Sequence, residues 1–166
     1  MRQSLQIPFL AILTLLCTQA CNQPGGKDGA GGDKGEHIIV PMKEMLLRDG
    51  IAYHGRKLKP FTGQANEYFP FKQDPQPLSV TRQFKEGKLH GMVTFFFNNG
   101  QKRSEIPYEN GIKQGEATNW YMTGEVQWKR SFNQNQLEGD SIRYNQKGEV
   151  LTHIIFNKGQ IAKAIK

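Results

Sequence analysis

A pattern of glycines that returns every 24 residues constrains the fold of this chain more than any other feature. Three series show this spacing: Gly91, Gly115 and Gly139; Gly100, Gly124 and Gly148; and Gly87, Gly111, Asn135 and Gly159. Two aromatic series keep the same step: Phe84, Tyr108, Phe132 and Phe156; and Phe96, Trp120 and Tyr144. Several series with one period indicate a tandem array of a single supersecondary unit, whose copies stack because none buries its apolar face alone.

The glycines stand where tight turns are expected. Asn99-Gly100, Asn110-Gly111 and Lys158-Gly159 are dipeptides that suit a turn needing a residue at positive φ. At position 135 asparagine replaces the glycine, and asparagine is the other residue that tolerates the left-handed region well. The series therefore has a conformational role and predicts β-hairpins.

Between the turns, apolar and polar residues alternate as in half-buried strands: Val126, Trp128 and Phe132 against Gln127, Lys129 and Ser131. Because the period is even, we expect the same parity in every copy. One face would then carry the whole core: Val80, Phe84, Phe96, Ile106, Tyr108, Trp120, Val126, Trp128, Phe132, Ile142, Tyr144, Val150, Ile154 and Phe156. The opposite face would be solvated and would carry Arg103, Glu105, Lys129, Arg143 and His153.

These patterns predict an all-β fold, an elongated, twisted antiparallel sheet of stacked β-hairpin repeats of 24 residues. Four repeats would occupy residues 61–166, with four extra residues absorbed by the proline-containing loop of residues 72–77. Residues 37–60 would form capping strands around a turn at Asp49-Gly50.

The first residues follow the pattern of an export signal. Residues 1–20 contain a basic end at Arg2, an apolar stretch from Ile7 to Leu16, and Ala20 immediately before Cys21. The apolar stretch is too short for a permanent membrane span. Residues 21–36 are rich in glycine and charge, and we expect them to form a flexible tether.

The junction at Cys21 resembles the lipobox of bacterial lipoproteins, which implies a diacylglyceryl group on the Cys21 thiol and a membrane anchor. The usual leucine three residues earlier is Thr18 here, and cleavage after Ala20 that leaves a soluble periplasmic protein is the alternative. Cys17 lies in the segment to be removed, so the mature chain would have no internal disulfide. The resemblance implies the cell envelope, and Asn22 instead of aspartate favours the outer membrane.

The repeat unit Tyr108-x-Asn-Gly111-x-x-x-Gly115 resembles the MORN repeat. Asp49-Gly50-x-x-Tyr53 followed by Pro60-Phe61-Thr62-Gly63 is similar to bacterial MORN-repeat proteins of the YwqK type, and the resemblance covers residues 46–161. That family is described as antitoxin-like, and MORN repeats are linked to membrane lipids and to protein scaffolding. The export signal argues against an antitoxin acting in the cytoplasm.

The sequence offers no constellation typical of catalysis. His37, His54, His90 and His153 lack metal-ligand spacing, and neither a nucleophile elbow nor a phosphate-binding glycine loop occurs. We therefore expect no catalytic residue, no metal and no cofactor. His90 shares its place in the repeat with Gln114 and Glu138, which indicates a polar turn position.

Two surfaces are candidates for binding. Lysine and arginine outnumber aspartate and glutamate by 22 to 15, and Arg103, Lys129 and Arg143 form a candidate basic face for anionic lipid, polysaccharide or an acidic protein. Solubility alone is the alternative reason for this excess, and the export signal disfavours nucleic acid. Val93, Phe95, Phe97 and Tyr121 lie on the outer parity, where they form either an apolar patch for a protein partner or a surface covered by other segments.

The function expected from the sequence is that of an exported, membrane-anchored lipoprotein acting as a non-catalytic binding or scaffolding module. The alternative is an antitoxin-like or immunity-type protein that neutralises a toxin in the envelope.

Overall fold

The computed structural model describes residues 38–72 and 74–166, and the expected signal, Cys21 and the tether lie outside this part of the chain. The described part is all β apart from one short 3-10 turn, η1 (Met42–Glu44). The predicted fold class is therefore confirmed.

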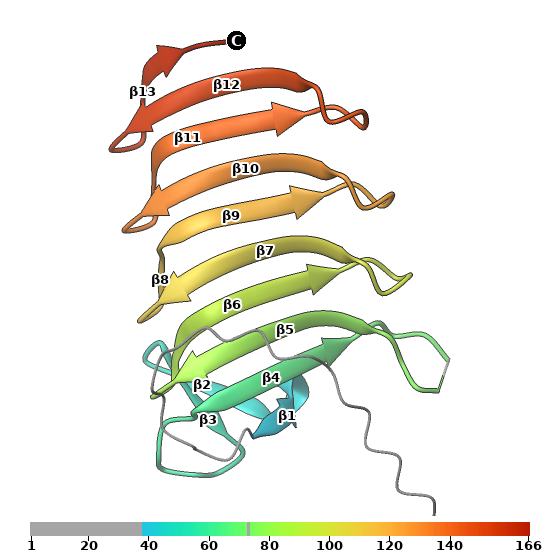
Figure 1. Ribbon diagram of the computed structural model, residues 1–166. Helices are drawn as coiled ribbons and strands as arrows, with labels where there is room; N and C mark the ends of the chain where they lie inside the picture. The colour runs from blue at the N-terminus through green and yellow to red at the C-terminus, as the bar shows by residue number, and fades with distance from the viewer. Residues whose placement is uncertain (1–37, 73) are drawn as a thin grey trace, which may run out of the picture. The chain divides into compact units, whose positions relative to one another are not determined.

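One open sheet contains most of the strands, which follow one another in chain order (Figure 1). Its spatial order is β1-β4-β5-β6-β7-β9-β10-β11-β12-β13, and the short β8 pairs with β7. The strand bounds are β1 (Ile39–Pro41), β4 (Gly63–Tyr68), β5 (Leu78–Lys85), β6 (Lys88–Phe96), β7 (Lys102–Glu109), β8 (Ile112–Lys113), β9 (Gly115–Trp120), β10 (Val126–Asn133), β11 (Gln136–Tyr144), β12 (Val150–Asn157) and β13 (Gln160–Ala164). All pairs are antiparallel except β1 with β4.

The hydrogen-bond register repeats with the period of the sequence. Equivalent partners are Val80 with Phe95, Ser104 with Asn119, and Trp128 with Arg143, each pair lying 24 residues after the previous one. The strand-to-strand pairing between hairpins repeats likewise: Val93 with Ile106, Ala117 with Arg130, and Ser141 with Ile154. The sequence repeat is thus a structural repeat of one hairpin.

Two-residue turns close the hairpins where the glycine series predicts them. Both central residues have positive φ, as in Asn110 (51°) and Gly111 (86°), which is the geometry that matches the twist of the flanking strands. In the third copy Gln134 and Asn135 adopt φ of 50° and 67°. The conformational role inferred for Asn135 is confirmed.

The expectation of a single core face is wrong. Paired residues in β5 and β6 have numbers of opposite parity, as Lys85 with Lys88 and Arg82 with Val93, because the turn between these strands has two residues, and the irregularity near Gly91 adds two more residues without changing the parity. We call the face with Val80, Val93 and Ile106 face A, and the opposite face with Thr81, Thr94 and Glu105 face B.

The two aromatic series consequently lie on opposite faces. Phe84, Tyr108, Phe132 and Phe156 belong to face A, near the two-residue turns. Phe96, Trp120 and Tyr144 belong to face B, at the other end of the strands, beside Lys102, Val126 and Val150. Each face therefore has one apolar strip, and the strips lie at opposite ends of the strands.

A separate hairpin, β2 (Met45–Arg48) and β3 (Ile51–His54), packs on the first repeat. The N–H of Ala52 donates to the carbonyl of Gly87 at 2.8 Å, and the N–H of Gly87 donates to the carbonyl of Phe61 at 2.7 Å. The main core lies at this junction between the hairpin and the first repeat, and it comprises Val40, Ala52, Phe61, Ala65 and Phe84. The apolar core is therefore concentrated at the start of the array.

Candidate functional site: a cationic sheet face

The residues of the expected apolar patch are not exposed together. Val93 is only 4% exposed and lies on face A between Arg82 and Ile106. Phe95 is half-buried on the same face, whereas Phe97 and Tyr121 begin the turns after β6 and β9. The hydroxyl of Tyr121 donates to the carbonyl of Tyr144 at 2.9 Å, so this side chain ties one turn to the next.

The three basic residues expected to share a face also separate. Arg143 lies on face A as the partner of Trp128, whereas Lys129 lies on face B as the partner of Ile142. Arg103 occupies a bulge, and its guanidinium carbon lies 5.5 Å from the centre of the Phe95 ring on face A. The expected grouping of Arg103, Lys129 and Arg143 is thus corrected, because the parity argument assigned Arg103 and Arg143 to the wrong face.

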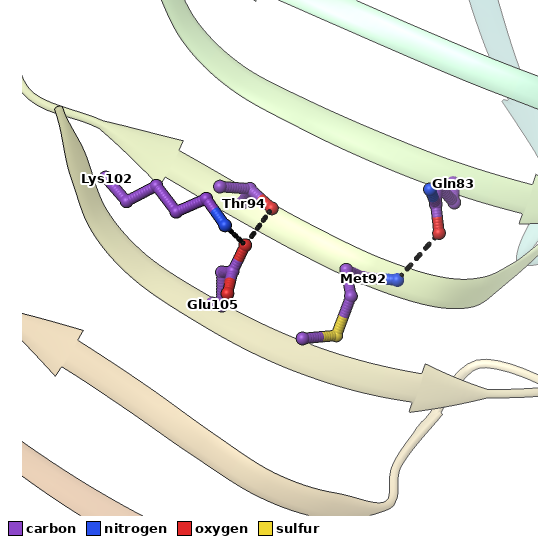
Figure 2. A network of polar contacts seen from close by, with 5 residues as sticks. All are labelled: Gln83, Met92, Thr94, Lys102 and Glu105. Atoms are coloured by element: carbon purple, nitrogen blue, oxygen red, sulfur yellow. Dashed lines mark hydrogen bonds and ion pairs between the residues drawn. The ribbon is translucent and has the colours of Figure 1, made fainter. Parts of the chain in front are cut away.

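On face B, carboxylates pair with Lys102 and Lys129. Figure 2 shows Glu105 accepting both from Lys102 Nζ, at 2.6 Å, and from the hydroxyl of Thr94, at 3.4 Å. The same view shows the side chain of Gln83 accepting the N–H of Met92 at 2.9 Å, which satisfies the backbone at the bulge.

Two further contacts to carboxylates lie on face B. Lys129 Nζ lies 2.9 Å from Glu116, and this hydrogen bond together with the charge of Glu116 raises the pKa of the Lys129 ammonium. His153 Nε2 lies 2.6 Å from Asp140. Face B therefore holds carboxylates beside its cations, in contrast to face A.

Face A has the opposite character. From β6 to β12 its strand positions hold no aspartate or glutamate among the described residues, but they hold Lys113, Arg130 and Arg143, with Arg103 at the bulge. Within the described residues none of these four cations forms an ion pair. The charges of the repeat sheet are thus segregated between its faces.

Three of these cations lie over the faces of aromatic rings. Arg103 lies over Phe95, Lys113 Nζ lies 5.4 Å from the centre of the Phe132 ring, and the guanidinium carbon of Arg130 lies 4.7 Å from the centre of the Trp128 ring. Such contacts are favourable because the ring face is electronegative, with Trp the strongest partner. The rings position the cationic groups without neutralising them.

One position of the repeat holds an arginine with a carboxylate partner in the first copy and an arginine without such a partner in a later copy. Arg82 and Arg130 occupy the same place two repeats apart, and Arg82 pairs with Glu67 at 3.0 Å. The position equivalent to Glu67 beside Arg130 is Asn119, whose amide donates to the side chain of Gln127. The later repeat therefore has an arginine at the equivalent position, Arg130, but an asparagine, Asn119, at the position of its carboxylate partner.

From the sequence alone, Arg130 and Trp128 could not be assigned to one surface with Arg103 and Arg143. The sequence indicates this grouping only through the residues that form the turns. A two-residue turn moves a face from even to odd residue numbers, and the positive-φ pairs Glu86-Gly87, Asn110-Gly111 and Gln134-Asn135 mark this turn in successive repeats.

Two hollows of the described part lie near the start of the array. One of about 500 Å³ lies in the loop between β4 and β5, and another of about 400 Å³ lies beside the β2–β3 hairpin. Neither is lined by a histidine, serine or cysteine. Within residues 38–72 and 74–166 no group of three or more His, Cys, Asp or Glu side chains is arranged to hold a metal ion.

None of the elements in the described ranges is a helix long and apolar enough to cross a membrane. Comparison with protein-family models and with curated proteins finds no match to this sequence.

Proposed function

We propose that the chain is an exported lipoprotein, anchored through Cys21, whose repeat sheet is a non-catalytic binding or scaffolding module of MORN-like repeats. The observation that carries the binding role is the segregation of charge. Face A presents Arg103, Lys113, Arg130 and Arg143 without a carboxylate from β6 to β12, whereas Lys102 and Lys129 on face B are each paired with a carboxylate.

A folded protein gains little by leaving like charges on one face, because their mutual repulsion opposes folding. Solubility alone is served equally well by interspersed charges. Arginine and tryptophan are also the residues most often found to dominate binding energy at protein interfaces. Trp128, Arg130 and Arg143 meet this description in one small area.

The anchor is supported by the sequence. A basic start, an apolar stretch, Ala20 before Cys21 and a glycine-rich segment after it form one consistent arrangement. Two acyl chains on Cys21 would hold the protein firmly, at about 0.8 kcal/mol for each buried methylene group.

The anchor is tested by mass spectrometry of the mature N-terminus after expression of the full chain in a bacterium, together with membrane fractionation. We expect a diacylglyceryl mass on Cys21, and release of the Cys21→Ser variant from the membrane fraction. An unmodified Cys21 in a soluble periplasmic fraction would contradict the anchor.

The binding role is tested by crosslinking in intact cells. The Arg130→Gln/Arg143→Gln variant changes face A, and the Lys102→Gln/Lys129→Gln variant removes the same charge from face B. We expect a crosslinked partner to be lost only in the first variant. Identical crosslinking patterns in the wild type and both variants would count against face A as the binding surface.

A further inference from the structure

We propose that face A across β7, β9, β10 and β11 is a docking site for an acidic polypeptide segment, centred on Trp128, Arg130 and Arg143. This inference rests on the proposed binding function and specifies the partner of the same surface. It is carried by three observations: the placement of Arg130 and Arg143 beside Trp128, the size of the residues next to Arg130, and the distribution of charge.

The centre of the site is built by strand pairing. Trp128 and Arg143 are direct cross-strand partners, and Arg130 follows Trp128 by two residues on the same face of β10. The Arg130 guanidinium lies over the Trp128 ring, with its carbon 4.7 Å from the ring centre, and its N–H groups donate to no side chain among the described residues. The edge of a guanidinium matches the two oxygens of a carboxylate and binds them bidentately.

Small neighbours keep Arg130 accessible. Its partners across the two adjoining strands are Ala117, which is fully buried, and Ser141. Neither side chain is long enough to cover the guanidinium, and Arg130 is exposed. At the equivalent place in the first repeat, Arg82 is half-buried and is already bound to Glu67.

The distribution of charge identifies the partner as anionic. Asn119 stands where Glu67 stands in the first repeat, so a carboxylate supplied by another molecule would replace the one that the repeat has lost. Arg103 and Lys113 extend the positive surface on either side of the centre. An extended segment with several Asp or Glu side chains matches a row of cations on neighbouring strands.

The same geometry favours a polypeptide over the other polyanions. The ring faces of Trp128, Phe95 and Phe132 are in contact with cations, so these faces are not free to stack on sugars. Trp128 and Phe132 are also half-buried among their neighbours, whereas insertion into a membrane interface requires apolar side chains that project from the surface.

The experiment measures binding of the purified full chain to fluorescent poly-L-glutamate by anisotropy. We expect Arg130→Gln/Arg143→Gln to weaken binding about tenfold, because each substitution removes a charge-assisted bidentate contact. The Lys102→Gln/Lys129→Gln control, with the same change in net charge, should weaken binding less than about twofold, because both lysines are already paired with carboxylates on face B. Circular dichroism verifies that both variants fold.

Trp128→Leu provides a second test that keeps every charge. Loss of the stacked ring frees the Arg130 side chain to move, so we expect binding to weaken by about threefold to tenfold. Unchanged binding would contradict the positioning role of Trp128.

Three outcomes would overturn the proposal. Equal losses in the two double variants would mean unspecific charge attraction. No binding of poly-L-glutamate would exclude the acidic polypeptide, and tighter binding of polygalacturonate or of phosphatidylglycerol vesicles, dependent on Arg130 and Arg143, would assign a polysaccharide or a membrane instead. If poly-L-glutamate does not bind, or if another polyanion binds more tightly, a crosslinked partner that depends on face A would still support the proposed binding function. The test therefore distinguishes failure of the acidic-polypeptide proposal from failure of the binding function.

Discussion

The carboxylate of Glu138 accepts a hydrogen bond from the backbone N–H of Lys158 at 2.6 Å, and so joins one hairpin to the turn of the next. The same connection occurs in earlier repeats, from Gln134 N–H to Gln114 at 3.1 Å, and from Asn110 N–H to His90 at 3.5 Å. Backbone bonds reinforce each junction: Gly111 donates to Leu89, Asn135 to Lys113, and Gly159 to Leu137. The polar turn position shared by His90, Gln114 and Glu138 therefore links neighbouring repeats.

Replacing Glu138 tests this link. We expect Glu138→Ala to lower the free energy of unfolding of the last repeat by about 1 kcal/mol, because the Lys158 N–H loses a charged acceptor at an exposed site. Glu138→Gln should retain most of the stability, since Gln114 makes the equivalent bond. Urea denaturation measures both, with the exposed Glu109→Ala as control. A cost equal to that of the control would show that the bond contributes nothing.

Asn135 allows the cost of the left-handed backbone to be measured. Asn135→Gly and Asn135→Ala both remove the side-chain oxygen that accepts the Lys113 N–H at 2.8 Å. Only alanine adds strain at φ of 67°, so we expect it to be less stable than the glycine variant by about 1 kcal/mol. Thermal and urea unfolding of the two variants give the difference. Equal stabilities would mean that the turn changes its conformation at little cost.

Gly91 tests the bulge. An added Cβ would meet the side chain of Gln83, and the backbone φ is 101°. We expect Gly91→Ala to destabilise the protein by about 1–3 kcal/mol, which should exceed the effect of Gly100→Ala, where no atom lies near the added carbon. Because Gln83→Ala by itself removes the acceptor of the Met92 N–H, it serves as the reference, and we expect Gly91→Ala to cost less in the Gln83→Ala background than in the wild type. An equal cost in the two backgrounds would indicate that backbone strain alone sets it.

The distribution of burial predicts a gradient of local stability. The buried apolar residues lie between Val40 and Ala117, and the described strands beyond Ala117 contain none. Because repeats interact chiefly with their neighbours, we expect the slowest amide exchange in β4–β6 and the fastest in β12 and β13. Hydrogen–deuterium exchange with mass spectrometry measures this directly. Uniform protection along the sheet would mean that the array opens only as one unit.

Much of the fold could be predicted from local signals. Residues such as Gly111 and Asn135 mark positive φ, which is a property of single residues and their immediate neighbours, and their spacing sets the length of each hairpin. The turn at Asp49-Gly50 is predicted for the same reason and the loop between β4 and β5 from its prolines, and both connect strands in the structure.

The composition of the candidate surface could not be predicted in this way. Which side chains share a face depends on how strands pair, and one residue of register moves every side chain to the other face. The two-residue turn at Glu86-Gly87 places even-numbered residues of β5 and odd-numbered residues of β6 on one face, so Phe96 and Phe84 separate although their residue numbers have the same parity.

By itself, the sequence determined the 24-residue hairpin period, the turn positions and the all-β class, because glycine, asparagine and alternation act through local backbone geometry. Only the tertiary structure decided that Arg130 and Arg143 flank Trp128 on a face without carboxylates, while Lys129 meets Glu116 on the other. It also decided that the β2–β3 hairpin encloses the core at the first repeat. These relations depend on hydrogen bonds between strands and on packing between distant segments, which no local pattern specifies.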